Sequence, residues 1–213
     1  MRTWIAAAVL AAVLAAACGG TLPATRYYQL APPPGVAARG DLTLVLEPLE
    51  TDAGYDDERM VYRTTPYRLD YYQYHRWSAA PGVLIGNFLE QALERSGKFR
   101  AVVRDHVADA PVILGGRVVA IEEVDTDRKH WNGRLVVELR LADARTGDVV
   151  WAQQYEETEP LRAQSPEGLA RALSVALGRI SDRAAPAIAD VAARQQAVHV
   201  AERAERAARL APR

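Results

Sequence analysis

Cysteine is almost absent from this sequence, because Cys18 is the single cysteine among 213 residues. One cysteine excludes an internal disulfide. Lysine is scarce as well, since Lys98 and Lys129 are the two lysines and arginine supplies the other basic residues. The 26 basic and 27 acidic residues nearly cancel, and this balance lacks the positive excess typical of nucleic-acid binding. We therefore expect no nucleic-acid partner.

Motifs that carry catalysis or bind metals are missing too. The histidines have neither a histidine four residues away nor a cysteine companion, so zinc-ligand spacings are absent; they are His75, His106, His130 and His199. There is no G-x-S-x-G, P-loop or G-x-G-x-x-G motif. One acidic group lacks the order of a calcium-binding loop and predicts a solvated loop: Asp52, Asp56, Asp57 and Glu58. We expect no enzymatic activity, cofactor or metal. The alternative is a hydrolase whose site is assembled only by the fold.

The N-terminal segment is the most informative part of the chain. Residues 4–17 are uncharged and follow Arg2. They are too few to span a membrane, which takes about 20 apolar residues, and are typical of the hydrophobic region of a secretory signal. The residues Ala15-Ala16-Ala17-Cys18 resemble a bacterial lipobox, whose cysteine receives a diacylglyceryl group and begins the mature chain.

Lipidation at Cys18 agrees with the energetics of membrane anchoring, because two or three acyl chains hold a protein stably where one does not. We therefore predict a signal peptide at residues 1–17 and lipidation at Cys18. The alternative is a soluble exported protein that is cut after Ala17. No second apolar run long enough to span a membrane follows, so we expect no transmembrane helix.

Composition divides the mature chain into a linker at 18–40, a domain at 41–190 and a tail at 191–213. The linker contains a Pro-, Gly- and Ala-rich stretch, preceded by an aromatic segment at 26–30 that predicts an edge strand. Strand patterns in the domain lie at 42–46, 60–64, 69–74, 101–104, 112–122, 135–141 and 149–155. Within one of them, Gly115 and Gly116 indicate a bulge or a close backbone approach.

Two amphipathic helices complete the predicted domain. Pro81 and Gly82 open the first, which ends at Ser96 and Gly97. Ser165, Pro166 and Glu167 open the second, and Pro186 is expected to kink or break it. The residues that follow are Ala-, Arg- and Glu-rich and predict a charged tail, either helical or disordered. The fold class is therefore α+β, with a mixed or antiparallel sheet of about six strands and two helices on one face.

Aromatic residues crowd the segment that precedes the first helix. From this segment we select Tyr62, Tyr72, Tyr74 and Trp77 as a candidate face for a partner protein or a lipid. The structural interpretation of the same residues is a sheet core with a cross-strand tyrosine ladder. The sequence leaves both interpretations open.

The order of several weak motifs resembles one known family. Tyr27-Tyr28-x-Leu30 precedes a linker, and Val61-Tyr62-Arg63, a tyrosine-rich strand and Arg76-Trp77 lead through Pro81-Gly82 into a helix with Leu89 and Leu93. Phe99, Val102 and Thr146-Gly147-x-Val149 precede a terminal helix. Over residues 26–190 this chain resembles the ABC-type transport auxiliary lipoproteins, which include the PqiC-like lipoproteins. The charged extension after residue 190 departs from that pattern.

The resemblance implies a non-enzymatic lipoprotein that faces the periplasm and serves an MCE-type lipid transport system. Its partners would be MCE-domain proteins, ABC transporter subunits and further copies of itself, and its cargo phospholipid or another apolar molecule. Gly19 stands where an aspartate would retain a lipoprotein at the inner membrane, which favours the outer membrane. The alternative is an envelope structural or assembly lipoprotein that binds the cell wall or an outer-membrane complex, with the tail as part of its binding surface.

Overall fold

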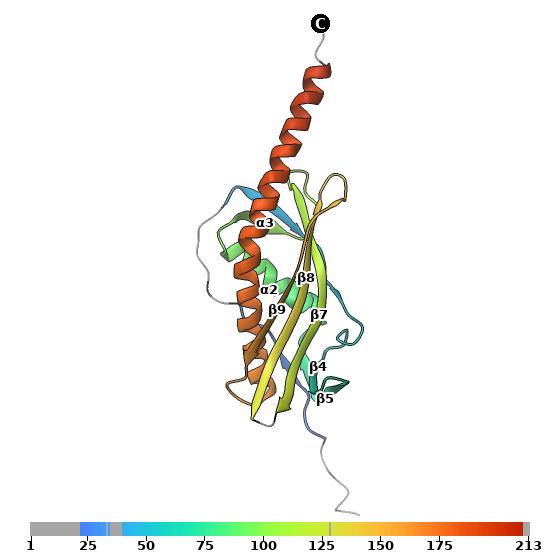
Figure 1. The fold of residues 1–213 in the computed structure, drawn as a ribbon, viewed down its shortest axis with the longest axis vertical. Coiled ribbons are helices and arrows are strands. Elements are labelled where there is room, and N and C mark those ends of the chain that lie inside the picture. Colours follow the sequence, from blue (N-terminus) through green and yellow to red (C-terminus); the bar gives the residue numbers. More distant parts are fainter. Residues whose placement is uncertain (1–21, 33, 35–39, 128, 211–213) are drawn as a thin grey trace, which may run out of the picture.

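The computed structural model describes residues 22–32, 34, 40–127 and 129–210. They form one mixed sheet with two helices, so the predicted α+β class is confirmed (Figure 1). The sheet has nine strands rather than about six. The elements are β1 (Arg26–Tyr28), β2 (Leu42–Leu46), β3 (Glu50–Thr51), β4 (Arg59–Thr65), β5 (Arg68–Trp77), α2 (Pro81–Arg95), β6 (Phe99–Val103), β7 (Val112–Asp127), β8 (His130–Asp143), β9 (Val149–Pro160) and α3 (Pro166–Leu210).

Strand β7 organises the sheet, because four other strands pair with it. Along one edge it pairs in parallel with β2, β3 and β4 in turn, and along the other it pairs antiparallel with β8. Strand β9 extends the sheet beyond β8. The predicted close approach is confirmed at Gly116, where a Cβ atom would lie 2.1 Å from the Glu138 carbonyl oxygen of β8.

Both helices cover the sheet and contact each other. Residues such as Ile85, Phe88 and Leu89 of α2 are buried against the sheet, as the apolar stripe of this helix predicts. The first turns of α3 bury Leu169 and Leu173 in the same core. Burial of apolar side chains from helices and sheet in one continuous core is the main stabilising contribution.

A buried carboxylate ties three segments together at β7. Glu122 Oε2 accepts hydrogen bonds from the Tyr55 hydroxyl at 2.7 Å and from Arg63 Nε at 3.1 Å, and Oε1 accepts one from Arg134 Nη1 at 2.9 Å. Its side chain is fully buried. Burial and the bond to Glu122 raise the pKa of Tyr55 to about 12. These bonds join the loop before β4 to β4, β7 and β8.

The expectation that Pro186 breaks the second helix is wrong. Helix α3 runs without interruption from Pro166 to Leu210. Pro186 and Asp182, whose carbonyl loses its usual partner, are both exposed, so water can solvate that carbonyl. Burial of Ile180 and Ile188 on either side of the proline offsets the lost hydrogen bond. Within the described residues, no helix is both long and apolar enough to cross a membrane.

A second buried carboxylate holds the later part of α3. Asp143, at the end of β8, accepts hydrogen bonds from Gln195 and from His199 Nε2, the latter at 2.8 Å. It also accepts hydrogen bonds from the backbone amides of Arg145 and Thr146, at 2.7 and 2.9 Å. Burial alone would raise the pKa of Asp143, but these hydrogen bonds outweigh it and lower the pKa to about 2.

The molecule is elongated, and its two ends differ (Figure 1). The described chain starts at one end, where the β7–β8 turn and the start of α3 also lie, and we call this the anchor end. The β8–β9 turn and the last turns of α3 lie at the opposite end, which we call the distal end. The described part of the predicted tail is thus helical, and its residues 201–210 project from the distal end.

Candidate ligand and partner surfaces

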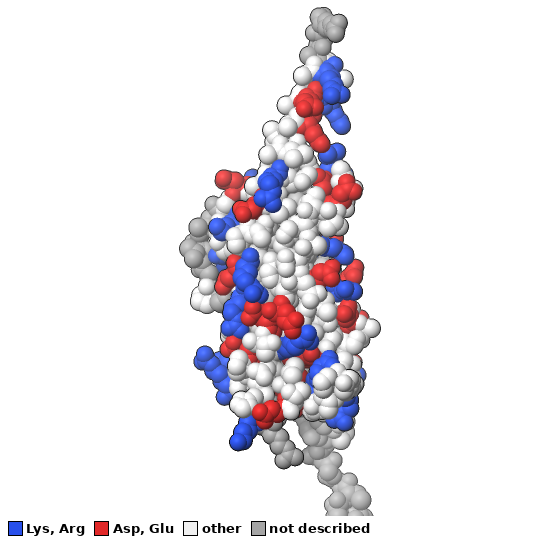
Figure 2. All heavy atoms as spheres, in the orientation of Figure 1, with Lys and Arg blue, Asp and Glu red and all other residues white. Residues whose placement is uncertain are grey.

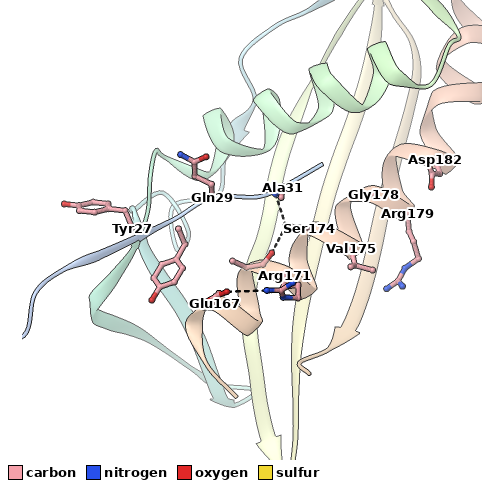
Figure 3. A pocket seen from close by; sticks show the side chains of 12 residues that line it. Tyr27, Gln29, Ala31, Glu167, Arg171, Ser174, Val175, Gly178, Arg179 and Asp182 are labelled. Carbon is pink, nitrogen blue, oxygen red and sulfur yellow. Dashed lines mark hydrogen bonds and ion pairs between the residues drawn. The ribbon is translucent and has the colours of Figure 1, made fainter. Parts of the chain in front are cut away.

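A groove of about 860 Å³ lies between the segment that contains β1 and the first half of α3 (Figure 3). Tyr27, Tyr28, Gln29 and Ala31 form one wall. The other wall consists of residues on the outward side of α3: Glu167, Ala170, Arg171, Ser174, Val175, Gly178, Arg179 and Asp182. The lining is therefore mixed, with small or apolar groups beside a charged rim.

Hydrogen bonds hold the two walls of this groove together. The backbone amide of Ala31 donates to Ser174 Oγ at 3.1 Å, and that hydroxyl donates to the Ala170 carbonyl at 2.7 Å (Figure 3). Next to them, Leu30 is buried in the core. Tyr27, by contrast, is 64% exposed, and its ring points away from α3 (Figure 3). The segment before the linker is thus fixed to α3.

The charged rim is itself anchored to the sheet. Arg179 donates to Glu157 at 2.9 Å and to Glu159 at 2.7 Å, and both carboxylates belong to β9. Arg171 pairs with Glu167 one turn away, at 3.3 Å. Between these arginines, Val175 is 43% exposed. An exposed apolar side chain between fixed charges gives the groove an amphipathic character.

A row of rings connects the predicted aromatic face to this groove. The rings of Tyr62 and Tyr72 have centroids 4.9 Å apart, and Tyr72 meets His75 edge-on at 5.6 Å. His75 Nδ1 lies 2.8 Å from the Tyr28 hydroxyl, and Tyr28 lines the groove. Tyr62 of β4 and Tyr72 of β5 thus form a cross-strand contact. The row of rings that begins with them continues through His75 and ends at Tyr28, in the groove.

The other two predicted residues lie apart from this row. Tyr74 is half-buried, and Trp77 is 1% exposed within the core. Trp77 reaches a partner only if the domain opens. Cys18, the predicted lipidation site, lies outside the described residues.

Glu123 is buried beside Tyr72 of the aromatic row and has one hydrogen-bond partner and no ion-pair partner among the described residues. Its side chain is inaccessible, Oε1 accepts a hydrogen bond from the Tyr72 hydroxyl at 2.9 Å, and Oε2 has no partner among the described residues. Burial, together with the nearby Asp125 carboxylate, raises the pKa of Glu123 to about 7. Burial and the negative charge of Glu123 in turn raise the pKa of Tyr72.

The remaining candidates for chemistry are dispersed. The four histidines each pair with a different residue: Tyr28, Glu47, Asp127 and Asp143. In the acidic group, Asp57 pairs with Arg59 at 2.7 Å and Asp52 with Arg117 at 3.3 Å. The described part of the chain holds no group of three His, Cys, Asp or Glu side chains arranged to bind a metal.

Sequence reasoning missed the groove. Its walls come from residues 27–31 and 167–182, and no spacing pattern relates segments so distant in the chain. The alternation of exposed Arg171, Val175 and Arg179 at four-residue intervals was the one available signal. On a helix, that spacing places the three side chains on one face.

The structure is an α+β domain with a groove between its N-terminal segment and α3. Residues 28–185 match the family of ABC-type transport auxiliary lipoprotein components. The match covers more than half of the chain, and the chain belongs to this family, as the motif order predicts. The family is described as an auxiliary transport lipoprotein and not as an enzyme.

Solved structures show the same fold. A protein from Xanthomonas campestris superposes with a TM-score of 0.70 at 17% identity, covering 78% of this chain and 96% of the other. An uncharacterised protein reaches a TM-score of 0.66 at 14% identity, covering 78% and 99%. A PelC dodecamer from Paraburkholderia phytofirmans is a more distant likeness, with a TM-score of 0.42, 18% identity and coverage of 70% and 91%. No curated protein matches the sequence.

Proposed function

We propose that this protein is a non-enzymatic accessory lipoprotein of an MCE-type ABC transport system. It is tethered through acyl chains on Cys18 to the outer membrane, faces the periplasm, and assists transport of phospholipid or another apolar molecule. The observation that carries the proposal is the family match over residues 28–185. The lipobox-like residues before Cys18 support it independently.

The groove is the surface that we propose contacts the apolar cargo. Tyr27 follows Cys18 by nine residues, and an extended chain covers at most about 3.5 Å per residue, so the groove lies within about 30 Å of the acylated cysteine. Its small and apolar residues suit an acyl chain. The row Tyr62–Tyr72–His75–Tyr28 widens this surface toward β4.

The test is in-cell crosslinking with the native signal peptide retained, followed by affinity purification from membranes and mass spectrometry of partners and lipids. We expect MCE-domain proteins, ABC transporter subunits and phospholipid. Recovery of cell-wall or outer-membrane assembly proteins without any MCE component would overturn the proposal and favour the envelope-assembly alternative.

The role of the groove has its own matched pair of variants. Val175→Glu places a charge in the groove, whereas Val149→Glu places one on β9 outside it, where the side chain is 61% exposed against 43% for Val175. We expect the phospholipid recovered per protein to fall for Val175→Glu and to stay at the wild-type level for Val149→Glu. Equal recovery from both would remove the groove from the proposal.

A further inference from the structure

A second cavity, of about 440 Å³, lies at the distal end. Three segments meet there: the β6–β7 loop at 107–110, the start of the β8–β9 turn at Ala144 and Arg145, and α3 from Gln196 to Arg206. Val107 and the neighbouring alanines give it an apolar floor. Two arginines of α3, Arg203 and Arg206, lie along its rim three residues apart.

Among the described residues, the acidic side chains in this cavity have ion-pair partners, whereas two of the arginines do not. Asp109 pairs with Arg100, and Glu202 pairs with Arg145 at 2.6 Å. Arg203 uses only its Nε, which donates to the carbonyl of His199 at 3.2 Å. Within the described residues, the terminal nitrogens of Arg203 and the whole guanidinium of Arg206 have no hydrogen-bond or ion-pair partner. Asp109 and Glu202 are therefore already paired with arginines, and the guanidinium groups of Arg203 and Arg206 can bind an anion.

The cavity is held in shape by the buried Asp143. This carboxylate binds the backbone of the β8–β9 turn next to Arg145, and it binds α3 at Gln195 and His199. Two of the three walls are thus attached to one side chain. The free guanidinium groups extend from a fixed wall.

The helix continues past this cavity as an exposed rod. Every residue of 201–210 is exposed, and this stretch spans about 15 Å at about 1.5 Å per residue. Figure 2 shows basic and acidic side chains along the projecting end. A helix so short gains little stability in water by itself, and the family match ends at residue 185. The α3 wall of the distal surface therefore lies beyond the matched residues, whereas the walls at 107–110 and 144–145 lie within them.

We propose that the distal cavity and the projecting end of α3 form a docking surface for an acidic segment of a protein partner. Guanidinium groups bind carboxylates with two parallel hydrogen bonds, and Arg203 and Arg206 present two such groups above an apolar floor. A protein fits better than a small anion because the surface continues from the cavity along about 15 Å of helix. The tether leaves from the anchor end, so headgroups of the anchoring membrane lie at the other end of the molecule.

This inference rests on the proposed function for the identity of the partner, which is a transporter component that approaches from the side away from the anchor. The surface would then fix how far from its own membrane the lipoprotein engages that component. In this arrangement the groove and the docking surface operate at opposite ends of one rigid domain.

A binding measurement on the full mature chain tests the chemistry first. The probe is a fluorescent oligoglutamate peptide, with oligoglutamine as its uncharged counterpart. We expect Arg203→Glu/Arg206→Glu to weaken oligoglutamate binding roughly tenfold, since two attractive pairs become repulsive. The control Arg162→Glu/Arg194→Glu makes the same change in net charge at exposed sites outside the cavity, and it should change affinity by less than about twofold. Equal loss in both double variants would show non-specific attraction and overturn the proposal.

Photocrosslinking in cells then tests the partner. With the native signal retained, a photoreactive residue at Ala207 should crosslink an acidic segment of an MCE or ABC component, and the Arg203→Glu/Arg206→Glu variant should lose the adduct. An adduct with peptidoglycan, or displacement of the peptide by inorganic phosphate as effectively as by free oligoglutamate, overturns the proposal. If the double variant still co-purifies MCE components at the wild-type level, docking here is wrong and the proposed function stands. If neither protein recovers any, the proposed function fails.

Discussion

Two adjacent glutamates of β7 are both buried, but their surroundings are opposite. Glu122 receives hydrogen bonds from two arginines and a tyrosine, whereas Glu123 receives one, from Tyr72. Successive side chains of a strand point to opposite faces, so neighbours in sequence meet different elements. Glu122 therefore joins segments through its hydrogen bonds, whereas burial raises the pKa of Glu123.

Replacement of Glu122 by alanine should lower the free energy of unfolding by about 2–3 kcal/mol, because Tyr55, Arg63 and Arg134 lose a buried hydrogen-bond acceptor. The control is Glu138→Ala on β8, whose carboxylate pairs with Arg117 at 3.4 Å at an exposed site and should contribute about 0–1 kcal/mol. Urea denaturation at neutral pH measures both. Similar losses in the two variants would contradict the network as described.

Glu123 should make stability depend on pH with an unusual sign. Its pKa rises from 4.5 in the unfolded chain to about 7 in the folded one, so the folded state binds more protons between these values. Stability should therefore fall as pH rises from about 4.5 to about 7 and then level off. Glu123→Gln should remove this slope, which amounts to roughly 3 kcal/mol over the whole range. Urea denaturation across this pH range is the measurement, and parallel curves for the two proteins would refute the assignment.

The glycine pair in β7 gives a third prediction for single residues. Gly116→Ala should destabilise the domain by about 1–3 kcal/mol or more, because the new methyl group meets the backbone of β8. Gly115→Ala is the internal control, since its Cβ would lie 3.6 Å from Glu47 Oε2 and 3.7 Å from Arg140 Nε, which are ordinary contact distances. The melting temperatures of the two variants should differ clearly. A tolerated Gly116→Ala would mean that β7 and β8 can separate at this point.

In α3, tertiary packing overrides the local helix-breaking tendency of a proline. Pro186 predicts a break, but the buried residues on both sides hold the helix together. Pro186→Ala should restore a backbone hydrogen bond and raise the free energy of unfolding by about 1–3 kcal/mol, as measured by chemical denaturation. A loss of stability instead would show that the domain requires the geometry imposed by the proline.

The strands were predictable where alternation is clean and less so where it fails. The pattern at 112–122 gave the start of β7, but the strand continues to Asp127 because Glu122 and Glu123 are buried charges that a polarity pattern assigns to solvent. Strand β3 has two residues, too few for any periodicity. The helix at Pro81–Arg95 was clear from its opening proline and apolar stripe.

The candidate surfaces were predictable only in part. Tyr62 and Tyr72 were selected from aromatic crowding, and they lie in one ring contact. Trp77 was selected with them and lies in the core, because crowding in sequence does not distinguish the two faces of a strand. The charges of Arg203 and Arg206 were visible in the tail, but the two loops that complete their cavity become neighbours only through the topology of the sheet.

For the whole molecule, the anchor and the fold should be separable. Cys18→Ala removes the acylated side chain but lies outside the residues that form the core. We expect this variant to move from the membrane to the soluble fraction, to lose transport function, and to keep the wild-type melting temperature. Cell fractionation and thermal unfolding measure the two properties. Retention in the membrane fraction would contradict lipidation as the anchor.

The position of β7 at the centre of the sheet also bears on how the chain reaches its native state. Strand β7 (Val112–Asp127) lies between β4 and β2 and pairs in parallel with β2, β3 and β4, so the preceding strands cannot join into one sheet while that segment is missing. Pairings between such distant segments are slow to form. In the export that we propose, the leading residues would therefore stay unfolded until β7 has crossed the membrane. A topology that delays folding in this way keeps the chain competent for translocation.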